Sequence, residues 1–129
     1  MILLDTCTLL WLSEDPVALS REVIDYIENT PPEQRFVSAI SALEIGILCK
    51  IERIELPTPP QEWFTRTIDL RSLNTISIDW DVALSSTLLP DFHKDPADRI
   101  IVATAQHLDA TIITPDKLVE QYDVKLFWK

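Results

Sequence analysis

Glycine, histidine and basic residues are scarce in this chain of 129 residues. The single glycine, Gly46, excludes the glycine-rich loops that cradle phosphates in nucleotide-binding proteins. The two cysteines, Cys7 and Cys49, lack the short spacing of a metal-binding pair, and we expect them to be reduced thiols. Uncharged stretches such as residues 100–108 are much shorter than the roughly 20 residues of a membrane span. We therefore expect a soluble cytoplasmic protein without a membrane segment or a signal peptide.

Positively charged residues are fewer than negatively charged ones. The chain has 11 basic and 21 acidic residues, which gives a formal net charge of −10. Proteins that bind nucleic acid through phosphate contacts alone are usually basic, so this balance argues against a simple nucleic-acid-binding module. It does not exclude a nuclease whose carboxylates are neutralised by metal ions.

What is present fits one domain with a real core, since 47% of the residues are hydrophobic. Apolar runs and turn residues predict strands that alternate with helices. The expected strands are 2–4, 36–37, 75–78, 111–114 and 124–127, and the expected helices are 6–12, 20–29, 41–51, a segment around 63–70, 80–89, 96–107 and 116–121. This alternation indicates an α/β fold with a parallel sheet covered by helices on both faces.

Four acidic residues follow the ends of predicted strands. Asp5 and Asp116 come just after strands, while Glu44 and Asp98 lie in the first turns of helices that follow strands or loops. Ligands of open α/β sheets bind outside the carboxyl ends of the strands, so we expect these acids to meet at one edge. Carboxylates packed together repel unless a cation is present, and oxygen ligands without paired His or Cys favour Mg²⁺ or Mn²⁺.

Each acid also has a structural interpretation. Glu44 could belong to a capping box that starts at Ser41, and Asp98 could complement a helix dipole. Asp116 could cap a short helix, and Asp95 precedes Pro96 as a typical helix cap. Asp5 is the hardest to explain structurally, because a carboxylate directly after a buried strand needs a partner.

Five segments carry a resemblance to a known family. They are M-I-L-L-D-T-C-T-L-L-W-L with Asp5, V-S-A-I-S-A-L-E-I-G with Glu44, C-K-I-E-R-I-E-L-P, H-K-D-P-A-D-R-I-I-V-A-T-A with Asp98 and Arg99, and I-I-T-P-D-K with Thr114 and Asp116. In their order and spacing these segments resemble PIN-domain ribonucleases of the VapC toxin type. The segment H-K-D-P-A-D-R is the most specific of the five, and together they span nearly the whole chain.

The resemblance implies a single PIN domain over residues 1–129, with about five parallel strands between helices. It implies a metal-dependent endoribonuclease that acts as the toxin of a type II toxin–antitoxin system, forms a homodimer and is inhibited by a cognate antitoxin. Asp5, Glu44, Asp98 and Asp116 would be catalytic. Of these, Asp5, Asp98 and Asp116 would bind Mg²⁺ or Mn²⁺.

Supporting roles are open at several positions. Thr6 could bond a metal-ligating carboxylate or a phosphate, or merely cap a helix. Thr114 could support the acids, and Asp95 could add a fifth carboxylate. Arg99 could contact an RNA phosphate or pair with a neighbouring acid. We expect the two histidines, His93 and His107, to be surface or helix residues rather than ligands.

Two other functions compete with the nuclease. A non-catalytic PIN module that binds a protein or RNA would be indicated by loss of one of the four acids, and none is lost. An aspartyl phosphatase is suggested faintly by the segment D-T-C-T, but its second acid would be at position 7, which is Cys7.

Overall fold

The computed structural model describes residues 1–129 and contains the predicted parallel sheet. Its strands are β1 (Ile2–Leu4), β2 (Arg35–Ser38), β3 (Asn74–Ile76), β4 (Thr111–Ile113) and β5 (Lys125–Phe127). They lie in the order β3-β2-β1-β4-β5, and every neighbouring pair is parallel. The first strand of the chain is therefore the central one.

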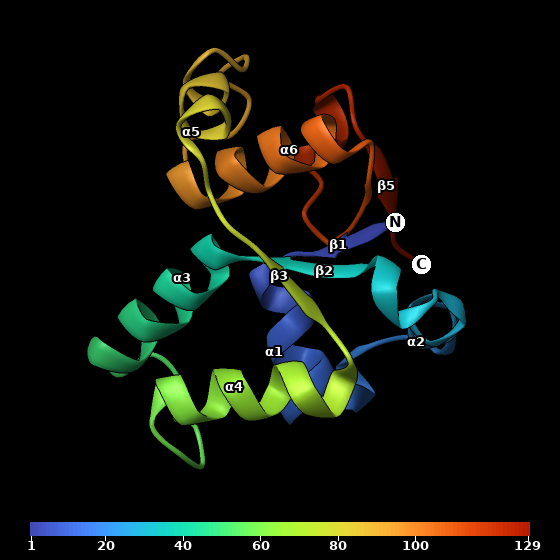
Figure 1. Cartoon of the computed structure of the whole chain (residues 1–129), viewed down its shortest axis with the longest axis vertical. Coiled ribbons are helices and arrows are strands. Elements are labelled where there is room, and N and C mark those ends of the chain that lie inside the picture. Colours follow the sequence, from blue (N-terminus) through green and yellow to red (C-terminus); the bar gives the residue numbers. More distant parts are fainter.

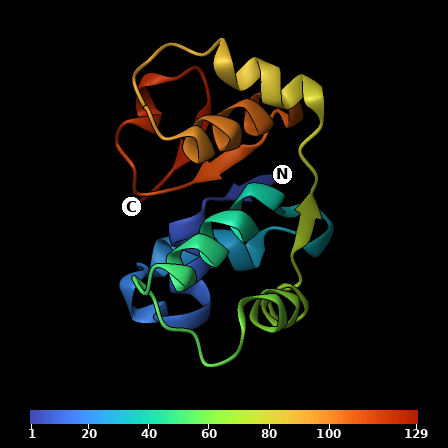
Figure 2. The ribbon, with the colours of Figure 1, turned by 90° about the vertical axis from the view of Figure 1, so that its left-hand side faces the viewer.

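Helices cover both faces of this sheet (Figure 1). They are α1 (Thr6–Glu14), α2 (Arg21–Asn29), α3 (Ala39–Lys50), α4 (Pro60–Arg71), α5 (Trp80–Thr87) and α6 (Pro96–Leu108), with single 3₁₀ turns at Pro16–Ala18, Pro32–Gln34 and Val119–Gln121. In Figure 1, α5 and α6 lie above the sheet, while α1, α3 and α4 lie below it. The same two layers are visible from the side in Figure 2. None of the helices has the length and apolar character needed to cross a bilayer.

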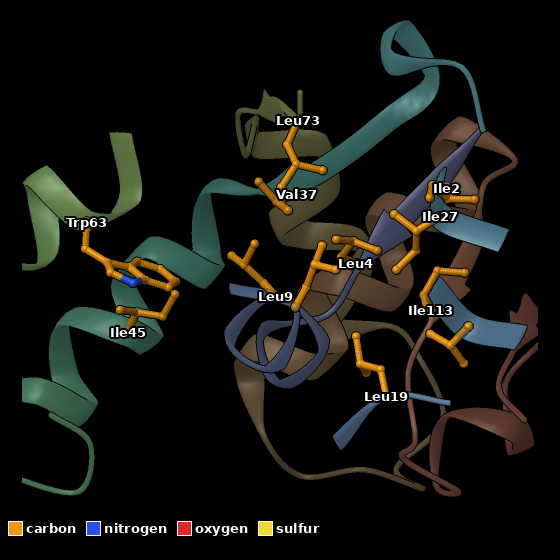
Figure 3. Packing of buried hydrophobic residues seen from close by; sticks show 12 residues of the cluster. Ile2, Leu4, Leu9, Leu19, Ile27, Val37, Ile45, Trp63, Leu73 and Ile113 are labelled. Carbon is orange, nitrogen blue, oxygen red and sulfur yellow. The ribbon is translucent and has the colours of Figure 1, made fainter. Parts of the chain in front are cut away.

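The alternation of side chains along β1 divides the core between the two faces. Ile2 and Leu4 belong to a cluster of 12 buried residues with α1, α2 and α4, where Trp63 of α4 is 3% exposed (Figure 3). Leu3 points the other way, into a cluster of 10 buried residues with Ile101 of α6. Because all three strand residues are buried, the apolar run at the start of the chain reads as a central strand.

The structure corrects three of the predicted elements. α3 begins at Ala39, because Ser38 accepts a hydrogen bond from the Ile40 amide and caps the helix two residues earlier than expected. The predicted helix 116–121 is reduced to the 3₁₀ turn Val119–Gln121. β3 ends at Ile76, two residues before the predicted end of that strand.

Candidate active site

Asp5 lies at the carboxyl edge of the sheet, where the register places it beside Thr114. Leu4 pairs with Ile113, and the Asp5 amide continues the ladder to the Ile113 carbonyl at 3.3 Å. One carboxylate oxygen of Asp5 accepts the Thr8 amide at 2.8 Å and caps α1, while the other accepts the Thr114 hydroxyl. The side chain is 6% exposed, and burial raises its pKa despite these hydrogen bonds, with the Asp116 charge adding to the rise.

Glu44 reaches the same edge from α3, and its capping-box interpretation is wrong. Ser38 caps α3, so Glu44 lies in the second turn, and Ser41 is fully buried instead of forming the cap. The Thr6 hydroxyl donates to the Glu44 carboxylate and lies 2.9 Å from Ser41 Oγ. Thr6 thus bonds Glu44, which is not one of the predicted metal ligands, and the helix cap is Asp5 rather than Thr6. Burial raises the pKa of Glu44, and Asp95 and Asp5 raise it further.

Asp98 lies in the first turn of α6, as predicted. Asp95 caps this helix by accepting the Ala97 amide at 2.9 Å, which confirms its structural interpretation. Burial and the adjacent Asp95 carboxylate raise the pKa of Asp98 to about 7, against a lowering by His93. A cation bound beside such a carboxyl group would lower its pKa.

Asp116 is held two residues beyond Thr114, in the loop after β4. Its amide donates to Thr114 Oγ1 at 3.0 Å, and its Oδ1 accepts the Leu118 amide at 2.9 Å. Asp116 therefore closes a turn of the loop and does not cap a six-residue helix. The Thr114 hydroxyl donates to the Asp5 carboxylate and accepts from the Asp116 amide, so one side chain links two of the acids.

His93 was missed by the sequence interpretation, which assigned it to the surface or to a helix. Its Nε2 lies 2.8 Å from Asp116 Oδ2 and 3.1 Å from Asp98 Oδ2, and its side chain is only 13% exposed. The three residues each present one ligand atom, and these atoms lie within 4.8 Å of one another. The position of His93 five residues before Asp98, in the most specific motif, was the available signal. His107, in contrast, lies in α6 beside the Ala103 carbonyl, as expected.

Of the two roles considered for Arg99, an RNA contact and a contact within the chain, the structure contains the second. Its guanidinium donates to the backbone carbonyls of four residues in the segment before α6, namely Ser86, Leu89, Pro90 and His93, at 2.8–3.2 Å. It also contacts Asp91 at 3.4 Å, but that carboxylate is 92% exposed. The donors of Arg99 are therefore used mainly to hold the backbone of this segment.

The four predicted acids line one cleft of about 400 Å³. Its walls are formed by Asp5, Thr6, Cys7, Leu10, Glu44, Leu48, Asp98, Pro115 and Asp116. No basic side chain contributes to these walls. Burial and the charges of Asp5 and Asp98 raise the pKa of the Cys7 thiol to about 11, so the cleft has no thiolate at neutral pH.

The donor set of this cleft fits a hard divalent cation. Its ligand atoms are carboxylate oxygens, which suit Mg²⁺ and Mn²⁺ better than soft metals. The hydroxyls of Thr6 and Thr114 orient two of the carboxylates without neutralising them. The raised pKa values of Asp5, Glu44 and Asp98 reflect a cost of packing these acids that a bound cation would offset.

The family follows from this fold and from a direct comparison. The PIN-domain family model matches residues 2–125, and the chain therefore belongs to the PIN-domain family. Among characterised proteins it is similar to Ribonuclease VapC22 of Mycobacterium tuberculosis (strain ATCC 25618 / H37Rv), at 33% identity over 122 residues that cover 94% of this chain and 91% of that protein.

Solved structures agree with the fold. A toxin–antitoxin complex from Klebsiella pneumoniae contains a chain that is 28% identical, with a TM-score of 0.67 over 98% of this chain and 96% of its own length. FitAB bound to an IR36 DNA fragment contains a chain with a TM-score of 0.70 and 21% identity over 98% of this chain and 94% of its own. At that identity the second likeness shows a common fold alone.

Proposed function

We propose that this chain is a metal-dependent endoribonuclease, the toxin of a type II toxin–antitoxin system, which hydrolyses RNA phosphodiester bonds in the cytoplasm. The observation that carries the proposal is the convergence of Asp5, Glu44, Asp98 and Asp116, from four separate segments, on one cleft. The similarity to Ribonuclease VapC22 supports the choice of RNA.

In this proposal Asp5, Asp98 and Asp116 hold Mg²⁺ or Mn²⁺. Such an ion would supply charge that activates a water and stabilises the leaving oxygen of the cleaved phosphodiester. Glu44 lines the same cleft, where its carboxylate would orient water from the hydrogen-bonded frame of Thr6 and Ser41. Thr114 keeps Asp5 and Asp116 in a fixed relative position.

Cleavage of a mixed RNA pool by the purified chain tests this function. Fragments should accumulate with Mg²⁺ or Mn²⁺ and disappear with EDTA, and the mapped ends should cluster at a few sites. DNA of the same sequences is the matched control for substrate class. Absence of metal-stimulated cleavage from every RNA offered would contradict the nuclease and favour the non-catalytic module.

The antitoxin is the proposed protein partner. A cleft lined by four acids in a chain of net charge −10 attracts a basic side chain, which could pair with the carboxylates in place of metal. An apolar groove of about 330 Å³ adjoins it and shares two residues, Glu44 and Leu48, with the cleft. A peptide with an apolar segment followed by Arg or Lys would occupy both.

Co-purification with the small protein encoded next to this gene tests that partner. Replacing the basic residue of its tail by Ala should weaken inhibition, and added salt should weaken the wild-type complex. Inhibition that responds to neither change would place the contact outside the acidic cleft.

We also propose that the chain forms a homodimer. Trp80 and Leu84 of α5 and Leu88, the residue after the helix, recur every four residues and are 73%, 58% and 84% exposed, respectively. Apolar stripes of this kind usually pack against another surface. Sedimentation of the wild-type chain and of an L84E variant tests the proposal, since a dimer formed through α5 should dissociate in the variant. A monomeric wild-type chain would contradict it.

A further inference from the structure

The imidazole of His93 lies between two of the proposed metal ligands, and two roles are open to it. As a ligand, its Nε2 would bind the ion with Asp98 and Asp116, and the spacing of the three residues permits this. As a donor, Nε2–H would instead hold the two carboxylates from the side. The two roles require opposite positions of the ring proton.

The hydrogen bond from the Asp95 amide distinguishes the role of metal ligand from the role of hydrogen-bond donor. This amide donates to His93 Nδ1 at 3.2 Å, and a nitrogen that accepts a hydrogen bond carries a lone pair rather than a proton. The proton of the neutral ring is then on Nε2, the atom that faces the carboxylates of Asp98 and Asp116. A metal-ligating histidine has the reverse arrangement, in which the second nitrogen donates to a carboxylate or carbonyl.

The backbone of His93 is held on both sides, which fixes the point from which the ring reaches the acids. Its amide donates to the buried Tyr122 hydroxyl at 2.9 Å, and its carbonyl accepts from Arg99 at 3.0 Å. Tyr122 in turn donates to the Pro90 carbonyl at 2.8 Å. A half-turn of the ring would break the bond to the Asp95 amide and withdraw Nε2 from the acids.

We infer that His93 is a positioning residue: its Nε2–H donates to the Asp116 carboxylate, lies 3.1 Å from the Asp98 carboxylate, and holds this pair in place to bind a divalent ion, without ligating the ion itself. The inference deepens the proposed function and rests on it for the metal. It assigns a task to the loop between α5 and α6, which otherwise has no part in the cleft.

The tautomer can be measured directly, because the chain has only two histidines. Ring ¹⁵N spectra of histidine-labelled protein should show a protonated Nε2 and a bare Nδ1 for His93. His107 is an internal reference with the opposite tautomer. Its Nδ1 lies 3.2 Å from the Ala103 carbonyl, which can only accept, so its proton should be on Nδ1. An H107Q variant assigns the signals. The His93 pattern should persist when Mg²⁺ is added.

Three outcomes would overturn the inference. They are a proton on Nδ1 alone, protons on both ring nitrogens at neutral pH, and loss of the Nε2 proton when Mg²⁺ binds. The last outcome would make His93 a ligand.

A matched pair of variants separates positioning from a merely structural role. In H93Q the side-chain amide reaches approximately the place of Nε2 and can still donate to the acids. In H93N it reaches only the place of Nδ1, so contact with Asp95 is possible but the acids lose their donor. Mn²⁺ affinity, read from the EPR signal of the free ion, should fall about tenfold or more in H93N and stay within about threefold in H93Q. Equal losses in both variants, or none in H93N, would contradict the inference.

These measurements use neither RNA nor an antitoxin. Their outcome for His93 is therefore independent of whether the chain proves to be a nuclease. A chain that binds Mn²⁺ and keeps the His93 tautomer but cleaves no RNA would refute the nuclease and leave the positioning role intact. A chain that cleaves RNA with His93 in another tautomer would do the opposite.

Discussion

The two halves of the cleft are built in different ways. On the sheet side, Asp5 and Glu44 are held by neutral hydroxyls from Thr114 and Thr6, which lie on or next to regular elements. On the loop side, Asp98 and Asp116 share one imidazole, that of His93. The sheet half depends on strand register, whereas the loop half depends on a segment whose carbonyls are held by Arg99.

The largest expected effect tests whether both halves are needed for activity. D5N and D98N keep the shape of each side chain and remove one charge each. RNA cleavage should fall about a thousandfold in either variant, since the loss of metal-assisted catalysis is worth several kcal/mol. Circular dichroism should show a folded chain. D123N, at an exposed position away from the cleft, is the control and should keep full activity. Full metal-stimulated cleavage by either variant would remove that half from the mechanism.

Arg99 tests the dependence of the loop half on its anchor. R99M leaves four carbonyls without their charged donor, so the free energy of unfolding should fall by about 3 kcal/mol in urea titration. Hydrogen exchange should speed up in residues 86–95 and stay slow in β1. R66M is the control, because the Arg66 side chain is 62% exposed on α4. Uniform loosening of loop and sheet would show that the halves are not separate.

A bound metal ion should contact both halves of the cleft and stabilise the folded chain. At a Mg²⁺ or Mn²⁺ concentration a hundredfold above Kd, the wild-type chain should gain about 2.7 kcal/mol of stability. Thermal unfolding with and without the ion measures this gain. D5N and D98N should each lose most of it if one ion bridges both halves. An ion that stabilises D5N as much as the wild type belongs to the loop half alone.

The pH dependence of the metal-free chain tests the loop half without an ion. The pKa of Asp98 is about 7 in the folded chain and 3.8 ordinarily, so from about pH 4 to pH 7 the folded state binds the extra proton. Stability with EDTA present should therefore fall as pH rises through this interval. D98N should flatten the profile there. A wild-type profile that rises with pH in the same interval would contradict the raised pKa.

The sequence allowed the fold and the four acids to be predicted because both depend on local patterns. Ile2-Leu3-Leu4 followed by Asp5 describes a buried strand with a carboxylate at its end, and the Asp95-Pro96 pair starts α6 as expected. The parallel sheet of five strands is confirmed. Its order was not predicted, because register depends on contacts between distant segments.

The other failures have two causes: local caps or turns that were assigned to the wrong residue, and contacts between distant segments. Ser38, and not Ser41, caps α3, because the chain turns into the helix immediately at the end of β2. Asp116 uses its carboxylate in a turn, so no helix starts there. His93 lies in a loop without periodicity, and its partners Tyr122 and Asp116 are 29 and 23 residues away along the chain. Contacts of this range leave no trace in a local pattern.

The position of β1 at the centre of the sheet has a consequence for synthesis on the ribosome. Ile2 pairs with Arg35 on one side and with Thr111 on the other, so the first strand made receives its second neighbour almost last. Until β4 emerges, the nascent chain keeps an open central edge, and Asp5 has no Thr114 or Asp116 beside it. The cleft is therefore assembled only near the end of translation, and a nascent chain that stops before β4 has only part of it.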